Sequence, residues 1–88
     1  VMIDTDFLDI TYAQYQINSF TPLIIRSQWL DEKNNLIYQF KSSPLSVDPS
    51  KYLSKDLKIP VWINPDNPKE YYMDLTRVPD LKRVLYDN

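Results

Sequence analysis

The sequence predicts a mainly β domain, a small antiparallel barrel or sandwich of about five strands with one or two short helical turns. Three observations predict this fold class. Apolar and polar residues alternate in several short segments, which is the period of a strand. Segments rich in proline, asparagine, aspartate and serine separate them, although the chain has no glycine. The length of 88 residues suits one domain, so residues 1–88 are predicted to form a single β-rich unit.

The first strand is predicted within residues 1–17, where the chain is extended. Val1, Ile3 and Phe7 share one phase of the strand period, whereas Leu8, Ile10 and Tyr12 share the other. This change of phase predicts a β-bulge, because one extra residue turns all later side chains to the opposite face. Residues 18–22 (Asn-Ser-Phe-Thr-Pro) then predict a turn.

A hairpin is predicted from residues 23–30 and 36–42, two alternating segments joined by a polar loop. In that loop, Asn34 or Asn35 can adopt the left-handed conformation that glycine usually supplies. Trp29 is in phase with the aliphatic residues of its strand and is expected in the core. The inward residues predicted for the second strand of the hairpin are Leu36, Tyr38 and Phe40.

Two short helical segments are predicted. Within residues 46–56, Asp48 can accept hydrogen bonds from free backbone amides, and Pro49 suits the first helical position. In residues 79–86 the apolar side chains fall on one face of a helix. They are Leu81, Val84 and Leu85.

The last two strands are predicted at residues 58–64 and 70–75, on either side of an Asn-Pro-Asp-Asn-Pro turn. Proline has no amide hydrogen to donate to a ladder, so Pro60 predicts an edge strand or a bulge. An edge can bind a partner's strand by strand addition, which makes Pro60 a candidate contact residue. The alternating apolar residues are Ile59, Val61 and Ile63, then Tyr71, Met73 and Leu75.

The residue types behind most acid–base, thiol and soft-metal chemistry are missing, since the chain has neither histidine nor cysteine. Without glycine, no phosphate-binding glycine loop can be built. Asp74 comes nearest to a desolvated carboxylate, but on a strand it points away from Met73 and Leu75 and is expected to be solvated or hydrogen-bonded. We therefore predict no enzyme activity, no catalytic residue and no cofactor.

Carboxylates are the remaining candidates for a metal site. Asp4 and Asp6 share one face of a strand, Asp9 follows, and clustered carboxylates can bind calcium. No glycine-containing calcium loop accompanies them, so we interpret them as a solvated or edge-protecting strand face. The turn itself accounts for Asp66 and Asn67. No metal ligand is predicted, and calcium binding is kept only within an alternative function.

A contact surface is predicted around Trp62. This residue is out of phase with the buried residues of its strand, so it lies on the opposite face, beside Tyr72 if the two strands pair. An exposed aromatic pair indicates a contact surface. The alternative is a sandwich whose second sheet covers both side chains. The candidate contact residues are therefore Trp62, Tyr72 and Pro60.

Several short strings occur in a particular order over residues 15–79. They are Gln28-Trp29, residues 37–42 (Ile-Tyr-Gln-Phe-Lys-Ser), Asp48-Pro49, residues 61–65 (Val-Trp-Ile-Asn-Pro), Asn67-Pro68, residues 71–75 (Tyr-Tyr-Met-Asp-Leu) and Pro79. This order resembles a bacterial membrane-associated family, domain of unknown function 3592, in which transmembrane helices typically accompany a small β-rich soluble domain. One departure is that the family often has an Asn-Gly turn where this chain has Asn18-Ser19. The resemblance implies a membrane-anchored full-length protein and brings no catalytic residues.

We expect a non-catalytic soluble domain of a bacterial membrane protein, acting as an interaction module for an unknown protein or envelope component. The chain starts with valine and is expected to be a fragment of a longer chain, anchored in a membrane only through a segment absent from it. The side of the membrane is left open. A formal net charge of −2 and no basic cluster give no footprint for nucleic acid. The alternative is a small-ligand or calcium-binding sensory domain.

Overall fold

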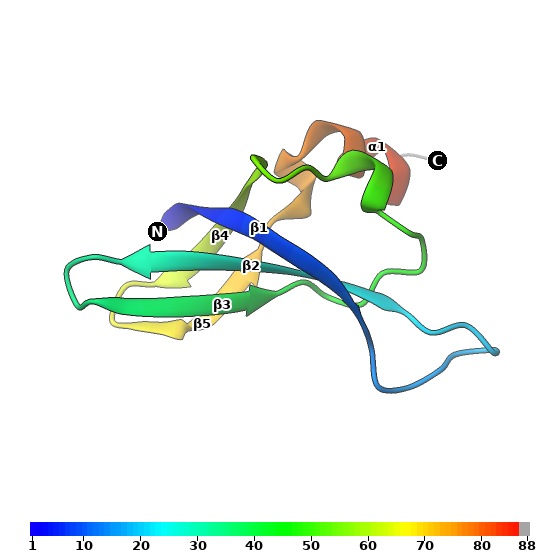
Figure 1. The fold of residues 1–88 in the computed structure, drawn as a ribbon, viewed down its shortest axis with the longest axis horizontal. Coiled ribbons are helices and arrows are strands. Elements are labelled where there is room, and N and C mark those ends of the chain that lie inside the picture. The colour runs from blue at the N-terminus through cyan, green and yellow to red at the C-terminus, as the bar shows by residue number, and fades with distance from the viewer. Residues whose placement is uncertain (87–88) are drawn as a thin grey trace.

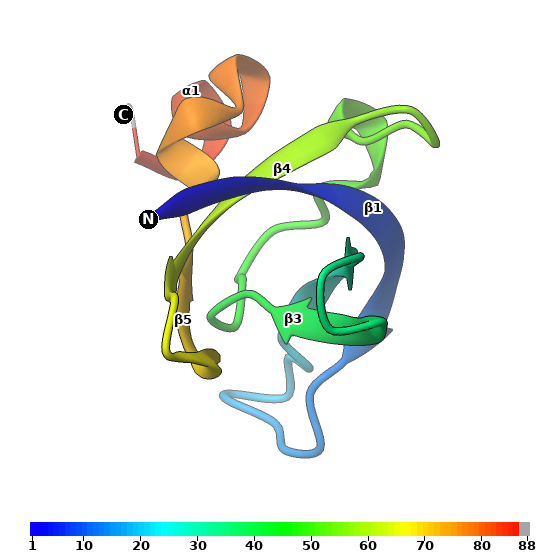
Figure 2. The same ribbon diagram turned by 90° about the vertical axis from the view of Figure 1, so that its left-hand side faces the viewer.

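A computed structural model describes residues 1–86, which form one antiparallel five-stranded sheet with a short helix and two 3₁₀ turns. The elements are β1 (Met2–Tyr12), β2 (Leu23–Asp31), β3 (Leu36–Lys41), the 3₁₀ turn η1 (Ser50–Tyr52), β4 (Lys58–Asn64), β5 (Asn67–Met73), the 3₁₀ turn η2 (Leu75–Arg77) and α1 (Pro79–Tyr86). The strand order is β3-β2-β1-β4-β5, and the sheet curls into a half-barrel (Figures 1 and 2). The predicted mainly β class is confirmed. All described strands belong to this one sheet, so the molecule is a curled half-barrel and not a sandwich.

The two edge strands, β3 and β5, approach each other at one end of the open seam. There the Tyr71 hydroxyl of β5 accepts a hydrogen bond from the Lys41 amide of β3, at 2.9 Å. The Tyr71 ring also meets Phe40 edge to face, with centroids 4.8 Å apart. A single side chain thus links the two edges that a complete barrel would join by backbone hydrogen bonds.

The core lies inside the curl, where the inward face of every strand contributes apolar side chains. After β5 the chain turns through η2 into α1, whose Leu81 is fully buried against this core. The buried cluster consists of Ile25, Phe40, Leu45, Ile59, Val61, Ile63, Met73, Leu75, Val78 and Leu81. The alternation predicted for β4 and the helical face predicted for Leu81 are therefore confirmed.

Three local features, in a strand, a loop and a 3₁₀ turn, can be compared directly with the sequence predictions. The register of β1 against β2 shifts between Phe7 and Asp9, which confirms the predicted bulge. In the β2–β3 loop Asn35 has a φ of 55°, as expected of a residue in place of glycine. Asp48 accepts a hydrogen bond from the Ser50 amide at 2.9 Å, which confirms its predicted role as an acceptor. Pro49 precedes η1 as its N-cap, so the prediction that it fills the first helical position is wrong.

The turn in the β1–β2 connection holds two residues in the left-handed region. Asn18 has a φ of 51° and Ser19 a φ of 65°, between the bridged residues Ile17 and Phe20. Positive φ at both central residues is the requirement of a type I′ turn, for which Asn-Gly is the preferred pair. Ser19 therefore adopts the backbone angle that glycine would adopt at lower cost.

The prediction that Pro60 marks an edge or a bulge is wrong. Strand β4 lies between β1 and β5, and its ladder with β1 has no register shift at Pro60. The Pro60 carbonyl accepts a hydrogen bond from the Asp74 amide, at 2.9 Å. In an antiparallel ladder the backbone nitrogen and oxygen of one residue both point toward the same neighbouring strand. The Pro60 nitrogen therefore faces the β5 side, at a position just beyond Met73, where β5 has already ended. An internal strand tolerates proline here because no partner carbonyl needs its hydrogen.

Several predicted boundaries also shift. Strand β1 ends at Tyr12, well before residue 17, and β5 begins at Asn67 and ends before Leu75, which lies in η2. Leu36, predicted to point inward, is 50% exposed because it lies at the hairpin end, beyond the side chains that fill the core. None of the helices within residues 1–86 has the length and apolar character needed to cross a membrane.

Candidate contact surface on the outer face of the sheet

Three large side chains form a row across the outer face of β1, β4 and β5. Met2 pairs with Trp62, and Trp62 pairs with Tyr72, so the three are direct cross-strand neighbours. Their exposed fractions are 40%, 41% and 55%, respectively. The row lies on the sheet face opposite the core, because Val61 and Ile63, which flank Trp62, are buried on the inner side.

Trp62 is held in place by a carboxylate at the end of β5. The indole Nε1 donates to Asp74 Oδ2 at 3.2 Å, while Asp74 Oδ1 accepts from the Thr76 hydroxyl at 2.5 Å and from the Thr76 amide at 3.2 Å. Asp74 therefore caps η2 and orients the indole with the same carboxylate. Only 8% of Asp74 is exposed, so its ionised form depends on these donors and on the nearby guanidinium.

Arg77 adds a cation to the edge of the row. Its Nε donates to Asp74 Oδ2 at 3.2 Å, and its guanidinium carbon lies 5.7 Å from the Trp62 ring centroid. The pKa of Asp74 is lowered chiefly by the hydrogen bond from the Thr76 hydroxyl, against the opposing effect of burial, and also by the Trp62, Thr76 amide and Arg77 donors. The site therefore presents a fixed aromatic surface beside a compensated ion pair.

We refer to Met2, Trp62, Tyr72 and Arg77 as the outer aromatic row. The adjacency of Trp62 and Tyr72 on one exposed face agrees with the sequence analysis. Met2 and Arg77 were not predicted, since Met2 joins the row only through the register of β1 against β4 and Arg77 only through the η2 turn. Pro60, the third predicted contact residue, is buried in the internal strand β4 and provides no free edge for strand addition.

Two of the three acidic residues of β1, Asp6 and Asp9, have cationic partners. Asp6 pairs with Lys58 of β4, and both Asp9 oxygens accept from Arg26, at 2.6 and 2.5 Å. The pKa of Asp9 is lowered, mainly by the hydrogen bond from Arg26. Because β1 is the central strand, these carboxylates do not protect an edge, and the edge-protecting half of the interpretation is wrong. The solvated half is confirmed for Asp4 and Asp6, whose side chains are exposed. Within residues 1–86 no group of three or more acidic side chains is placed to hold a metal ion.

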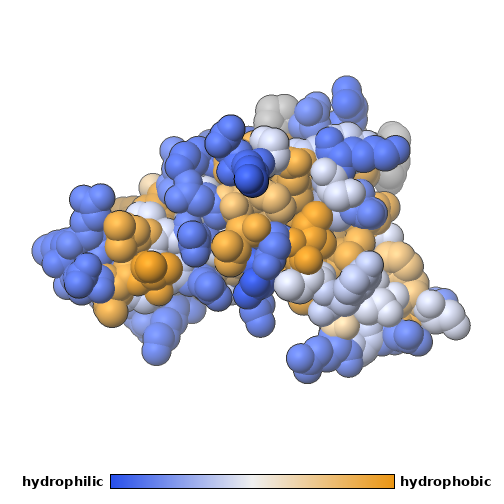
Figure 3. All heavy atoms as spheres, in the orientation of Figure 1, coloured by the Kyte–Doolittle hydropathy of each residue, from blue (hydrophilic) through white to orange (hydrophobic). Residues whose placement is uncertain are grey.

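Apolar side chains are also exposed elsewhere on the molecule. Leu30 pairs with Ile37 near the β2–β3 loop, and both are exposed. Figure 3 shows apolar atoms at this end of the molecule, on the left, and over the crossing of β1 and β2 in the middle. Among the described residues 1–86, the hydrogen bond from Trp62 to Asp74 is the only one that joins an exposed aromatic side chain to a buried polar side chain.

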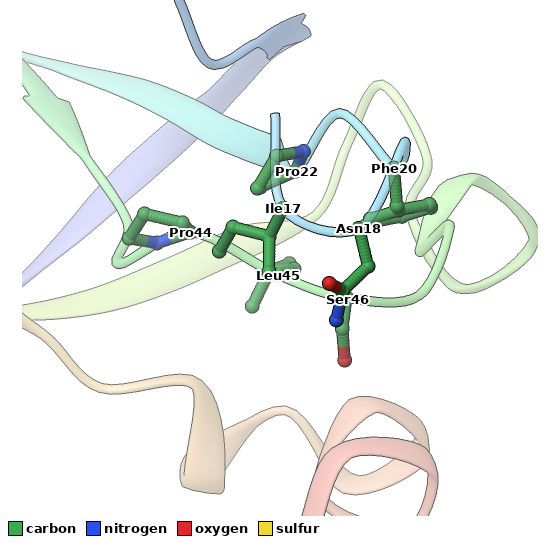
Figure 4. A pocket seen from close by; sticks show the side chains of 7 residues that line it. All are labelled: Ile17, Asn18, Phe20, Pro22, Pro44, Leu45 and Ser46. Carbon is green, nitrogen blue, oxygen red and sulfur yellow. The ribbon is translucent and has the colours of Figure 1, made fainter. Parts of the chain in front are cut away.

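A pocket of about 350 Å³ lies between the β1–β2 connection and the segment after β3. Its lining side chains are Ile17, Asn18, Phe20, Pro22, Pro44, Leu45 and Ser46 (Figure 4). Ile17 and Leu45 lie at its centre, and the only polar lining groups are the Asn18 amide and the Ser46 hydroxyl. This pocket can make apolar contacts but holds no charged group for acid–base chemistry or ion binding.

Comparison of the chain with protein-family models, with curated proteins and with solved structures found no match in any of the three. The resemblance to domain of unknown function 3592 therefore stays a prediction.

Proposed function

We propose that this chain is a non-catalytic interaction module that binds a protein or envelope component through the outer aromatic row. The observation that carries the proposal is that Trp62 and Tyr72, a direct cross-strand pair, are 41% and 55% exposed while a buried carboxylate fixes the indole. Exposed apolar side chains in contact with one another are characteristic of interaction sites. Tryptophan, tyrosine and arginine are also the residues most enriched in binding hot spots.

Fixing the indole favours binding for a thermodynamic reason. A side chain that is already held in one rotamer loses less conformational entropy when a partner covers it. Arg77, lying against the indole and bonded to Asp74, provides a polar rim in which its charge is already compensated. A partner can therefore cover the row without leaving an unpaired charge at its border.

The test is site-specific photo-crosslinking in the cells that make the natural full-length protein. A photoreactive residue at position 72 should crosslink to one defined partner, and Trp62→Ala should reduce the yield. Position 12 is the matched control, because Tyr12 is also an exposed tyrosine but lies at the far end of β1. Equal crosslinking from both positions, or none from position 72, would contradict the proposal. A urea melt of the Trp62→Ala domain separates lost contact from lost folding.

We also propose that the full-length protein is anchored in a bacterial membrane, in line with the family resemblance. Fractionation of the full-length product, with protease added to intact cells, tests this. Sedimentation with membranes and cleavage of this domain would place the domain outside the cell membrane, whereas protection would place it inside. A full-length product that stays entirely in the supernatant would contradict anchoring.

A further inference from the structure

The part of the chain that the structure describes buries two carboxylates, Asp31 and Asp74, each 8% exposed. Asp74 has a guanidinium partner and an indole beside it, as described for Arg77 and Trp62. Asp31 has a neutral partner: Asn34 donates its amide N–H to Oδ1 at 3.4 Å and its side-chain Nδ2 to Oδ2 at 2.8 Å. Within residues 1–86 Asp31 makes no ion pair. A buried carboxylate without a cation is costly, which suggests that the cation comes from elsewhere.

Asp31 lines a cavity of about 370 Å³ at the open end of the half-barrel. The cavity lies between the β2–β3 and β4–β5 hairpins, whose loops both lie at the left-hand end of the molecule in Figure 1. Trp29 and Tyr38 line it as well, a cross-strand pair with ring centroids 5.9 Å apart and planes inclined by 24°. Ile3 and Ile63 provide apolar lining, and Asp66 adds a second carboxylate from the β4–β5 turn. We call this space the mouth cavity.

The contents of the mouth cavity match the chemistry of one group. A guanidinium is planar, stacks on aromatic rings and binds both oxygens of a carboxylate at once. Each Asp31 oxygen accepts one hydrogen bond from Asn34 and retains a further lone pair for such a donor. The chain's own three arginines are already engaged, Arg26 with Asp9, Arg77 with Asp74 and Arg83 with Asp80.

We propose that the mouth cavity binds a guanidinium group, carried by a free small molecule or by an arginine side chain of a peptide. Asp31 accepts its N–H groups, Trp29 and Tyr38 contact its plane, and Asp66 lies at the rim. The bound group would complete a set of carboxylate, guanidinium and aromatic ring, the same set that Asp74, Arg77 and Trp62 form within the chain. The site is separate from the outer aromatic row, so either proposal can fail without the other.

Two other cations lie near this space. Lys33 lines the cavity from the β2–β3 loop but makes no ion pair with Asp31 or Asp66 in the described residues. Val1 also lines it, and its amino group donates to the Ile63 carbonyl at 2.9 Å. The test therefore uses N-terminally acetylated chain, which removes the amino charge as a competitor.

The experiment is an NMR titration of the isotopically labelled 88-residue chain at constant ionic strength. The probes are arginine, N-acetylarginine amide and citrulline, which has the shape of arginine without its charge. We expect saturable shifts at the Trp29 indole and the β2–β3 hairpin amides with both arginine probes, and at least about tenfold weaker binding of citrulline. Asp31→Asn should weaken arginine binding by a similar factor. Asp56→Asn, an exposed position near the other end of β4, and Trp62→Ala should leave it unchanged.

Equal binding of citrulline and arginine, shifts confined to other faces, or no saturable shift with either arginine probe would overturn the proposal. Tighter binding of the amide than of free arginine indicates a peptide source, and the reverse indicates a small molecule; both support the guanidinium site. If Asp31→Asn alters the whole spectrum, the substitution has disturbed the fold. The proposal is then tested by whether the unsubstituted chain binds arginine more tightly than citrulline.

Discussion

Asp74 shows how one side chain can organise a surface. Its two oxygens accept from Thr76, Trp62 and Arg77 while only 8% of the residue is exposed. Removing this carboxylate takes the hydrogen-bond acceptor away from the η2 turn, the Trp62 indole N–H and the Arg77 guanidinium at the same time. The outer aromatic row therefore depends on a residue that is not part of the exposed surface.

We expect Asp74→Ala to destabilise the domain by about 2 kcal/mol, because it removes a capping acceptor and leaves partly buried donors without a partner. Urea unfolding measures this. Asp80→Ala is the matched control, since its ion pair with Arg83 is exposed and 3.6 Å long and should change stability by less than about 0.5 kcal/mol. Equal effects of the two substitutions would contradict the role given to Asp74.

The lowered pKa of Asp74 predicts a pH dependence of stability. Its main cause is the hydrogen bond from the Thr76 hydroxyl, which favours the charged form. A carboxylate with a lower pKa in the folded state stabilises the fold fully above its unfolded value of about 3.9, and this contribution disappears as the pH falls through the folded value. Between about pH 6 and pH 3, Asp74→Asn should therefore lose less stability than the natural chain. Identical losses in urea melts across this range would rule out the assignment.

At the scale of elements, the tight turn in the β1–β2 connection carries local strain. Asn18 and Ser19 both have positive φ, a conformation that costs a residue with a Cβ more than it costs glycine. The strain is tolerated because the bridge between Ile17 and Phe20 requires a turn of this hand.

Ser19→Gly should stabilise the domain by about 0.5 kcal/mol, since relief of the left-handed penalty exceeds the added entropy of the unfolded chain. Thermal and urea unfolding measure the change. Ser43→Gly makes the same replacement where the described φ is not positive, and it should be neutral or destabilising. A loss of stability with Ser19→Gly would contradict this prediction. It would show that the Ser19 side chain stabilises the fold by more than the free-energy cost of its positive φ.

At the scale of the whole molecule, the seam between β3 and β5 separates a half-barrel from an open sheet. Tyr71 spans it with a hydrogen bond to Lys41 and a ring contact with Phe40. Strand β5 carries Pro68, Lys69 and Glu70, residue types that discourage further pairing at an exposed edge. The seam therefore depends on side-chain contacts for closure.

Tyr71→Phe should keep the ring contact but remove the acceptor for the Lys41 amide, at a cost of about 1 kcal/mol. Amide exchange at Lys41 should accelerate, and urea unfolding should report the loss of stability. Tyr72→Phe removes a hydroxyl from the opposite face of the same strand and should cost less than about 0.5 kcal/mol. Unchanged exchange at Lys41 in Tyr71→Phe would show that the seam does not need this bond.

Local patterns predicted much of this architecture because they report local physics. Alternation located the strands, the phase change at Phe7 located the bulge, and asparagine in the β2–β3 loop located the positive φ. Pro60 shows where such reasoning stops. The missing N–H of proline costs a ladder hydrogen bond only where a carbonyl of the neighbouring strand faces it. Whether one does so at Pro60 depends on where β5 ends, more than ten residues further along the chain.

The sequence by itself determined the class of the protein and the residue chemistry available to it. Strand periodicity and turn composition specify a small β domain, and Trp62 is placed on the outer face because it is out of phase with Val61 and Ile63. Only the tertiary structure decided strand order, the closing of the seam and the setting of each carboxylate. These depend on pairing between distant segments, which is what buries Asp31 beside aromatic rings and supplies Asp74 with donors.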